Sequence, residues 1–200
     1  NPSLTINVNR PPEIVSSSTK SIEENISTDH LVYSTEVAST SDTLSYSISG
    51  TDDSYFNFDT SNGEVRFINS PNFEVKESYN FIVSVSDGSL SSEQEITINI
   101  SDINDAPSIE SSSFGTLQIG SSLEAVIYDA DASDPDGDQL TYSLSGDDEV
   151  LVRIDPNNGE VRLISEGDFT TKPTYNFDVI VWDGTLTDQQ SITLAYSLDP

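Results

Sequence analysis

The feature that most constrains the fold of this chain is an internal repeat. The pentapeptide NGEVR occupies residues 62–66 and returns at residues 158–162, an offset of 96. The segment LSYSISG at residues 44–50 returns as LTYSLSG at residues 140–146 with the same offset. Self-similarity at a fixed period marks a repeated structural unit. Because about 100 residues is also a common domain size, the 200-residue chain is predicted to contain two tandem domains.

The domain limits follow from the same comparison. Residues 4–8 (LTINV) resemble residues 96–100 (ITINI), which close the first unit. We therefore expect residues 1–10 to be the last strand of a preceding repeat or a linker, residues 11–106 to form repeat 1, and residues 107–200 to form repeat 2. The parent protein is then expected to be an array in which each repeat has neighbouring repeats of the same chain.

The residue pattern within each unit predicts β-strands. Residues 81–86 and 96–100 alternate apolar with polar residues and are rich in β-branched and aromatic side chains, which suits a sheet with one buried face. Asn-Gly and Asp-Gly pairs lie between such runs, where a type I′ hairpin turn requires positive φ. These pairs start at Asn62, Asp87, Asn158 and Asp183. An all-β chain with one β-sandwich per unit is therefore expected.

The net charge restricts the partners of the chain. Seven Lys and Arg residues stand against 35 Asp and Glu residues, which gives a net charge of −28. Nucleic acids and anionic membrane surfaces would be repelled by this charge, whereas cations would be attracted. No apolar run approaches the roughly 18 residues of a membrane span, so no membrane insertion is expected.

The composition also argues against most kinds of enzyme. With no Cys and a single His, neither a thiolate or His-rich metal site nor a Ser-His-Asp triad of the usual kind is supported. No nucleophile with a base partner stands out, and the paired acidic residues are better explained as metal ligands than as catalytic acids. We therefore expect a protein that is not an enzyme.

Oxygen ligands gather in two short segments. The first holds Asp102, Asn104 and Asp105, and the second holds Asp134, Asp136 and Asp138. Ca²⁺ takes six to eight oxygen ligands, and Gly137 permits a tight turn that can direct the second set toward one point. A solvated acidic linker is the alternative explanation for the first set. The two sets together favour a calcium site.

These motifs resemble those of cadherin repeats, particularly the bacterial cadherin-like repeats of large surface adhesins, and the resemblance covers almost the whole chain. Residues 102–107 (DINDAP) are similar to the interdomain DxNDN motif, with Ala106 in place of its last Asn. Residues 134–136 look like the DxD motif, and residues 181–183 like the xDx motif. In the first unit, Glu24 and Asn25 resemble the Glu-Asn pair near the start of a repeat, and residues 72–74 (NFE) resemble the DRE motif.

The resemblance implies two tandem Greek-key sandwiches of the immunoglobulin-like class and a Ca²⁺ site where they join. The implied ligands are Glu24, Glu74, Asp102, Asn104, Asp105, Asp134, Asp136 and Asp183, with the carbonyl of Ile103 as an additional one. Asp183 has an alternative explanation, because its Asp-Gly pair already suits a hairpin turn. Glu23 is the alternative to Glu24 as the glutamate that binds calcium.

Departures from the repeat pattern predict that calcium binds unevenly along the chain. Residues 9–12 (NRPP) lack the acidic linker and add Arg10, so Asp87 is expected to find no calcium-binding partners there. In the second unit, Thr170 stands where the first has Glu74, and no Glu-Asn pair matches the one at Glu24.

The function implied is that of a calcium-stiffened structural and adhesion module, extracellular or at the cell surface, serving as extender repeats of a bacterial adhesin. The alternative is a module that binds carbohydrate or a protein ligand, with a polysaccharide or a cell-surface protein as partner. Exposed aromatic side chains such as Trp182 or Tyr142 would carry that binding. Trp182 itself is expected in the core, because large aromatic residues are more often buried.

Overall fold

A computed structural model describes residues 10–39, 43–166 and 170–197 of the chain. The chain divides into two compact units, unit 1 from Asn1 to Ile103 and unit 2 from Asn104 to Pro200. The division lies three residues before the boundary between residues 106 and 107 that the sequence predicts. Among the described residues, no helix is long and apolar enough to cross a membrane.

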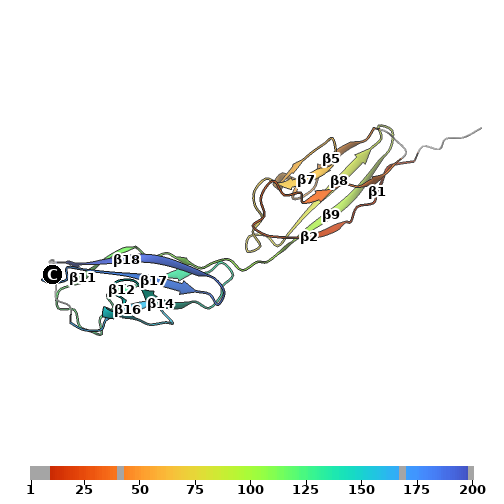
Figure 1. The fold of residues 1–200 in the computed structure, drawn as a ribbon. Coiled ribbons are helices and arrows are strands. Elements are labelled where there is room, and N and C mark those ends of the chain that lie inside the picture. The colour runs from red at the N-terminus through yellow and green to blue at the C-terminus, as the bar shows by residue number, and fades with distance from the viewer. Residues whose placement is uncertain (1–9, 40–42, 167–169, 198–200) are drawn as a thin grey trace, which may run out of the picture. The chain divides into compact units, whose positions relative to one another are not determined.

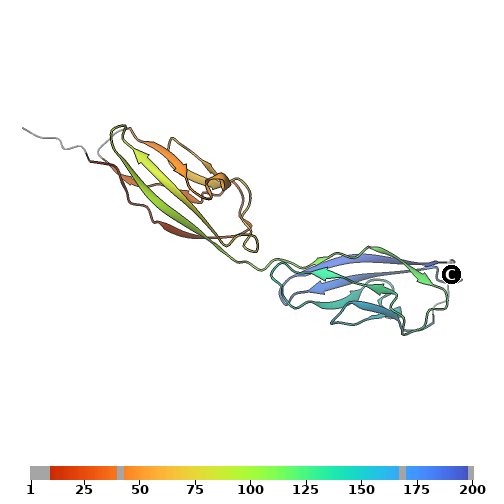
Figure 2. The same ribbon diagram turned by 180° about the vertical axis from the view of Figure 1, so that it is seen from behind.

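Unit 1 is built from nine described strands and one short 3-10 helix. A four-stranded sheet has the order β2-β9-β8-β5, a three-stranded sheet the order β3-β7-β6, and β1 pairs with β4. Figures 1 and 2 show unit 1 from opposite sides. The elements are β1 Glu13–Ile14, β2 Thr19–Glu23, β3 Tyr33–Ser34, β4 Val37–Ala38, β5 Ser45–Ser49, η1 Asp53–Tyr55, β6 Phe56–Phe58, β7 Glu64–Phe67, β8 Ser78–Ser86 and β9 Ser91–Ser101.

Unit 2 repeats this arrangement. Its sheets have the orders β11-β18-β17-β14 and β12-β16-β15, and β10 pairs with β13. The elements are β10 Ser108–Ile109, β11 Phe114–Gln118, β12 Tyr128–Asp129, β13 Ala132–Ser133, β14 Thr141–Ser145, η2 Glu149–Leu151, β15 Val152–Ile154, β16 Glu160–Leu163, β17 Thr174–Trp182 and β18 Thr187–Ser197. The all-β prediction is confirmed.

The two larger sheets of each unit pack face to face around one core. In unit 1, the ring of Phe56 on β6 lies 4.8 Å from that of Phe81 on β8, centroid to centroid, so the sheets meet there. Every second residue of β8 is buried, as the alternation of the sequence predicts. In unit 2, Tyr128 on β12 meets Phe177 on β17 in the same way, at 6.3 Å. Both units are therefore sandwiches.

Parallel pairing places the ends of two strands together at one end of each unit. β2 pairs with β9 in parallel, with Glu23 opposite Ser101. β11 pairs with β18 in parallel, with Gln118 opposite Ser197. In unit 1, the residues that follow these two strands, Glu24 and Asp102, therefore lie side by side.

The hairpin positions are confirmed, but the predicted turn type is wrong. The Asp-Gly pairs join β8 to β9 and β17 to β18, and the Asn-Gly pairs join β6 to β7 and β15 to β16. A type I′ turn requires positive φ at both central residues. The Gly of each pair has positive φ, but the Asn or Asp before it does not, because Asn25 is the single described non-Gly residue with positive φ. At Asp87 and Asp183, the loops are four residues long and the Asp side chain accepts N–H groups within the loop.

The prediction that Trp182 lies in the core is also wrong. Val179 and Val181 face the core of unit 2, so the strand alternation turns Trp182 outward, where 47% of it is exposed. Tyr142 is buried in the core instead. Only one of the two aromatic residues considered for ligand binding is therefore available at the surface.

Candidate metal centre

Glu24 is the buried anchor of a carboxylate cluster in unit 1. It directly follows β2 and is 2% exposed. Its Oε2 accepts the N–H of Phe73 at 2.8 Å, and its Oε1 accepts the N–H of Ile103 at 2.9 Å. Its own N–H donates to the carbonyl of Ser101. A carboxylate has about four acceptor positions, so each oxygen can still bind a cation.

Two exposed carboxylates converge on this anchor. Glu24, Glu74 and Asp102 each offer one oxygen, and these atoms all lie within 4.8 Å of one another. Two oxygens bound to one Ca²⁺ lie at most about 4.6–5.2 Å apart, which is twice the usual Ca–O distance. Three anionic oxygens at this spacing suit a hard divalent cation and repel one another without it. The three side chains therefore fit calcium.

The acidic residues of unit 2 form a second group. Asn104 directly follows the unit boundary, and its Nδ2 donates to Oδ2 of Asp183 at 3.0 Å. Oδ1 of Asp183 accepts the N–H groups of Thr185 and Leu186, both at 2.6 Å. Asp183 thus serves the hairpin turn with one oxygen and faces Asn104 with the other. The hairpin explanation offered by the sequence is therefore correct, and the role of Asp183 as a calcium ligand stays a prediction.

Hydrogen bonds keep Asp183 ionised. The side chain is 8% exposed. Burial raises its pKa, but the hydrogen bonds from Asn104, Leu186 and Thr185 outweigh burial and hold the pKa below its ordinary value. An ionised carboxylate that is already oriented is the form that a cation binds.

The loop after β13 carries two more carboxylates, and one of them contacts this group. Oδ2 of Asp136 accepts the N–H of Asp105 at 2.7 Å. Oδ1 of Asp134 accepts the N–H of Asp138 at 3.1 Å. Oδ2 of Asp134 is buried and has no hydrogen-bond partner. A buried carboxylate oxygen without a partner is costly, and a bound cation would satisfy it.

Eight of the nine residues named from the sequence thus belong to two groups, one in each unit. Glu24, Glu74, Asp102 and Ile103 meet in unit 1, and hydrogen bonds link Asn104, Asp105, Asp136 and Asp183 in unit 2. Asp134 contacts Asp138 within its own loop, and its place in the second group stays a prediction. Ile103 contributes its N–H to the anchor, and the role of its carbonyl stays a prediction. Glu23 is exposed on β2, so Glu24 is the residue that joins the cluster.

Sequence reasoning missed the N–H donors and an ion pair next to the turn that carries Glu74. Lys76 contacts Asp52, which is 4% exposed. The sequence does contain a signal for this pair, because Lys76 returns as Lys172 at the repeat offset in a chain with only seven basic residues.

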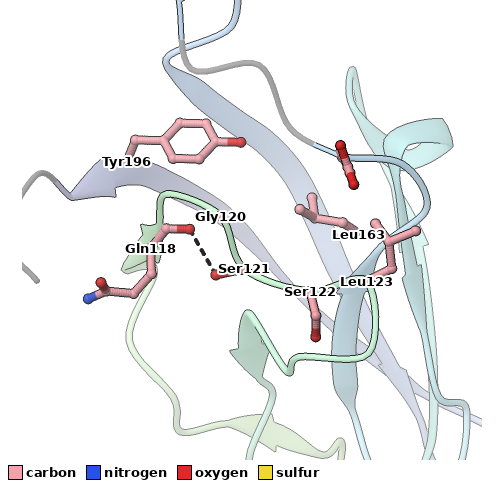
Figure 3. A pocket seen from close by; sticks show the side chains of 8 residues that line it. Gln118, Gly120, Ser121, Ser122, Leu123, Leu163 and Tyr196 are labelled. Atoms are coloured by element: carbon pink, nitrogen blue, oxygen red, sulfur yellow. Dashed lines mark hydrogen bonds between the residues drawn. The ribbon is translucent and has the colours of Figure 1, made fainter.

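At the C-terminal end of unit 2, the described residues do not form such a carboxylate cluster. Because Gln118 faces Ser197 as Glu23 faces Ser101, Ile119 stands where unit 1 has Glu24. Thr170 stands where unit 1 has Glu74. The turn that follows β11 instead lines a cavity of about 470 Å³, with Tyr196 and Leu163 among its walls (Figure 3). At these two described positions, the acidic residues of the unit 1 cluster are therefore not repeated.

Comparison with known proteins now identifies the family. The family described as Bacterial Ig domain matches residues 104–195. The Fat-like cadherin-related tumor suppressor homolog of Drosophila melanogaster is 31% identical over 150 residues, which is 71% of this chain and 3% of that protein. Protocadherin Fat 1 of Homo sapiens is 30% identical over 141 residues, or 65% of this chain and 3% of that protein. The chain is a tandem pair of cadherin-like repeats.

Solved cadherin structures share the fold of these cadherin-like repeats. The match to human protocadherin-24 EC1-2 (form II) covers 96% of this chain and 100% of the protocadherin chain, with a TM-score of 0.68 and 20% identity. The match to Drosophila N-cadherin EC1-4 covers 94% of this chain and 50% of the N-cadherin chain, with a TM-score of 0.66 and 22% identity. The sandwich of each cadherin-like repeat is thus the cadherin fold.

Proposed function

We propose that this chain is a calcium-stiffened structural and adhesion module, extracellular or at the cell surface, of the kind that serves as extender repeats of a bacterial adhesin. The observation that carries the proposal is the convergence of Glu24, Glu74 and Asp102 to within 4.8 Å. Unit charges about 4 Å apart repel by about 1–4 kcal/mol in surroundings between bulk water and a protein surface. Ca²⁺ removes this repulsion and binds all three side chains.

Chain connectivity supports the stiffening role. Asp102 and Ile103 belong to the first group, and Asn104 and Asp105, the next residues along the chain, belong to the second. If each group binds calcium, the four consecutive residues 102–105 of the connecting segment are all held in place. Fixing those residues restricts the freedom of the connection, and Pro107 already limits the backbone beyond it. Calcium would thus convert a hinge into a stiff connection.

The surface location and the bacterial assignment rest on the comparisons. The chain spans 3% of each of the two curated relatives named above, and their names describe cadherins. The match described as Bacterial Ig domain supports the assignment to a bacterial adhesin. Cadherin relatives also support a role other than catalysis. The net charge of −28 suits a calcium-rich, salty environment.

Thermal unfolding with and without calcium tests the proposal. With the dissociation constants of about 10⁻⁴–10⁻³ M typical of extracellular sites, millimolar calcium should stabilise the protein by about 1–2 kcal/mol per ion. For a domain of about 100 residues, each kcal/mol raises the unfolding midpoint by about 4–8 °C. Magnesium is the control ion, because its near-octahedral preference fits this kind of cluster poorly.

A matched variant makes the result specific. Glu74→Gln removes one exposed cage carboxylate and keeps the shape of the side chain. Glu74→Gln should remove most of the calcium-dependent increase in the unfolding midpoint and leave the midpoint in chelator nearly unchanged. Equal midpoints in calcium and chelator for the unaltered chain, together with no heat of calcium binding, would contradict the proposal.

A further inference from the structure

A partly buried ion pair lies next to the turn that carries Glu74. The Nζ of Lys76, whose side chain is 32% exposed, lies 3.1 Å from Oδ1 of Asp52, whose side chain is 6% exposed. Oδ2 of Asp52 accepts the N–H of Asn80 on β8 at 2.7 Å. The Lys76 ammonium also lies 5.2 Å from the ring centroid of Tyr79 and 5.8 Å from that of Tyr55. The ammonium is therefore held by charge, by a hydrogen-bonded partner and by two aromatic faces.

The loop between Asn72 and Lys76 is a closed turn. The carbonyl of Asn72 accepts the N–H of Lys76 at 3.0 Å, and its Oδ1 accepts the N–H of Val75 at 2.8 Å. Within this turn, Phe73 donates its N–H to Glu24. Glu74 follows Phe73 directly. One short turn thus contacts one cage carboxylate and carries another.

The side chain of Lys76 attaches this turn to the core of unit 1. Asp52 is fixed to β8 through Asn80 and precedes η1, so it belongs to the rigid part of the sandwich. The pair joins the C-terminal end of the turn to that rigid part. Neither Lys76 nor Asp52 is among the three cage carboxylates.

We propose that Lys76 and Asp52 are positioning residues for calcium, holding the turn so that Glu74 and the Phe73 N–H meet Glu24 in a geometry ready to bind the ion. This inference rests on the proposed function. Partners outside the ligand shell that orient metal ligands typically change metal affinity by about 10–100-fold when removed.

Unit 2 provides a matched control within the same chain. The Nζ of Lys172 lies 2.7 Å from Oδ1 of Asp148, whose Oδ2 accepts the N–H of Asn176 at 2.7 Å. Lys172 also lies 5.6 Å from the ring centroid of Tyr175. The turn here carries Thr170 in place of Glu74. The two pairs are alike, but among the described residues only the pair in unit 1 lies in a unit with a carboxylate cluster of this kind.

Calcium titration by calorimetry of Lys76→Met and Lys172→Met tests the inference. Lys76→Met should weaken the tightest calcium binding by about tenfold, the lower end of the range for such partners. Lys172→Met should leave it unchanged. Removing a positive charge near an anionic site strengthens cation binding by simple electrostatics. A loss of affinity in Lys76→Met therefore reports positioning, and Lys76→Arg should restore it.

The metal-free protein gives an independent measurement. In chelator, the amide hydrogens of Phe73 and Val75 should exchange at least several-fold faster in Lys76→Met than in the unaltered chain. Lys76→Met leaves Asp52 as an unpaired buried charge and could fail to fold for that reason. In that case the double variant Lys76→Met/Asp52→Asn, which removes the charge, is used in place of Lys76→Met in both measurements.

The outcomes separate the two proposals. Unchanged or tighter calcium binding in Lys76→Met, or an equal loss in Lys172→Met, overturns the positioning role. If the unaltered chain binds no calcium, the proposed function fails. The positioning role for calcium then fails with it, whatever the exchange rates show about the turn.

Discussion

At the scale of single residues, backbone N–H groups orient the carboxylate of Glu24 at the proposed calcium site. Its buried carboxylate accepts N–H groups from Phe73 and Ile103, which come from two separate segments of unit 1. The sequence identifies Glu24 through family resemblance, but its burial and its donors cannot be read from the residue pattern. Adjacent Glu23 has the same chemistry, and only the register with Ser101 separates them.

Asp134 provides a prediction in which the sign depends on calcium. Asp134→Asn removes a charge whose Oδ2 is buried without a hydrogen-bond partner. In chelator, the variant should be as stable as the unaltered chain or more stable, because the cost of that buried oxygen is reduced. In millimolar calcium it should be less stable, because a ligand is lost. Urea unfolding in both conditions measures this crossover.

The control for this crossover is the hairpin aspartate Asp87. Asp87→Asn retains an oxygen that can accept the N–H groups of Ser89 and Leu90 and removes the same charge. Its unfolding free energy should change equally in calcium and chelator. A calcium-specific loss in Asp87→Asn as large as that in Asp134→Asn would show that the hairpin end of unit 1 also binds calcium.

At the scale of secondary structure elements, alternation in the sequence predicts the strands well. β8 and β17 are buried at every second residue, as their patterns require. The same alternation places Trp182 on the exposed side of β17, whereas the usual burial of large aromatic residues predicts wrongly that it lies in the core. The hairpins are predictable from Asp-Gly and Asn-Gly, but their turn type is not. The four-residue loops with Asp side chains as acceptors require positive φ at Gly only.

The contact between η2 and β17 makes the stability of unit 2 depend on pH. Burial raises the pKa of Asp148, but the Lys172 ammonium and the N–H of Asn176 outweigh it and hold the pKa below its ordinary value. A lowered folded-state pKa contributes stability that is present above the unfolded pKa, about 4, and is lost as pH falls through the folded pKa. Unit 2 should therefore lose stability below about pH 4.

Asp148→Asn measures this contribution. The variant should be less stable than the unaltered chain at about pH 7 and should lose less stability between about pH 5 and pH 3. Asp147→Asn removes a neighbouring exposed charge without disturbing the contact, and should keep the full pH dependence. Identical pH profiles for Asp148→Asn and the unaltered chain, measured by urea unfolding, would contradict the assignment.

At the scale of the whole molecule, the repeat preserves the scaffold and not the site. The cores of the two units match, and so do the pairs Lys76 with Asp52 and Lys172 with Asp148. The cage residues have diverged, with Ile119 and Thr170 in place of Glu24 and Glu74. The equivalence of Ile119 depends on strand register, because the early strands match at an offset one residue shorter than the later ones. Sequence comparison at one fixed offset therefore misses it.

The last prediction concerns the connection between the units. If calcium fixes residues 102–105, small-angle scattering should show a narrower distribution of distances and a larger mean dimension in calcium than in chelator, because a hinge samples bent states. Glu74→Gln and Asp134→Asn, one from each unit, should each reduce this change. Lys172→Met should retain it. Identical scattering curves in calcium and chelator, in a chain that calorimetry shows to bind the ion, would mean that calcium stabilises the units without stiffening their connection.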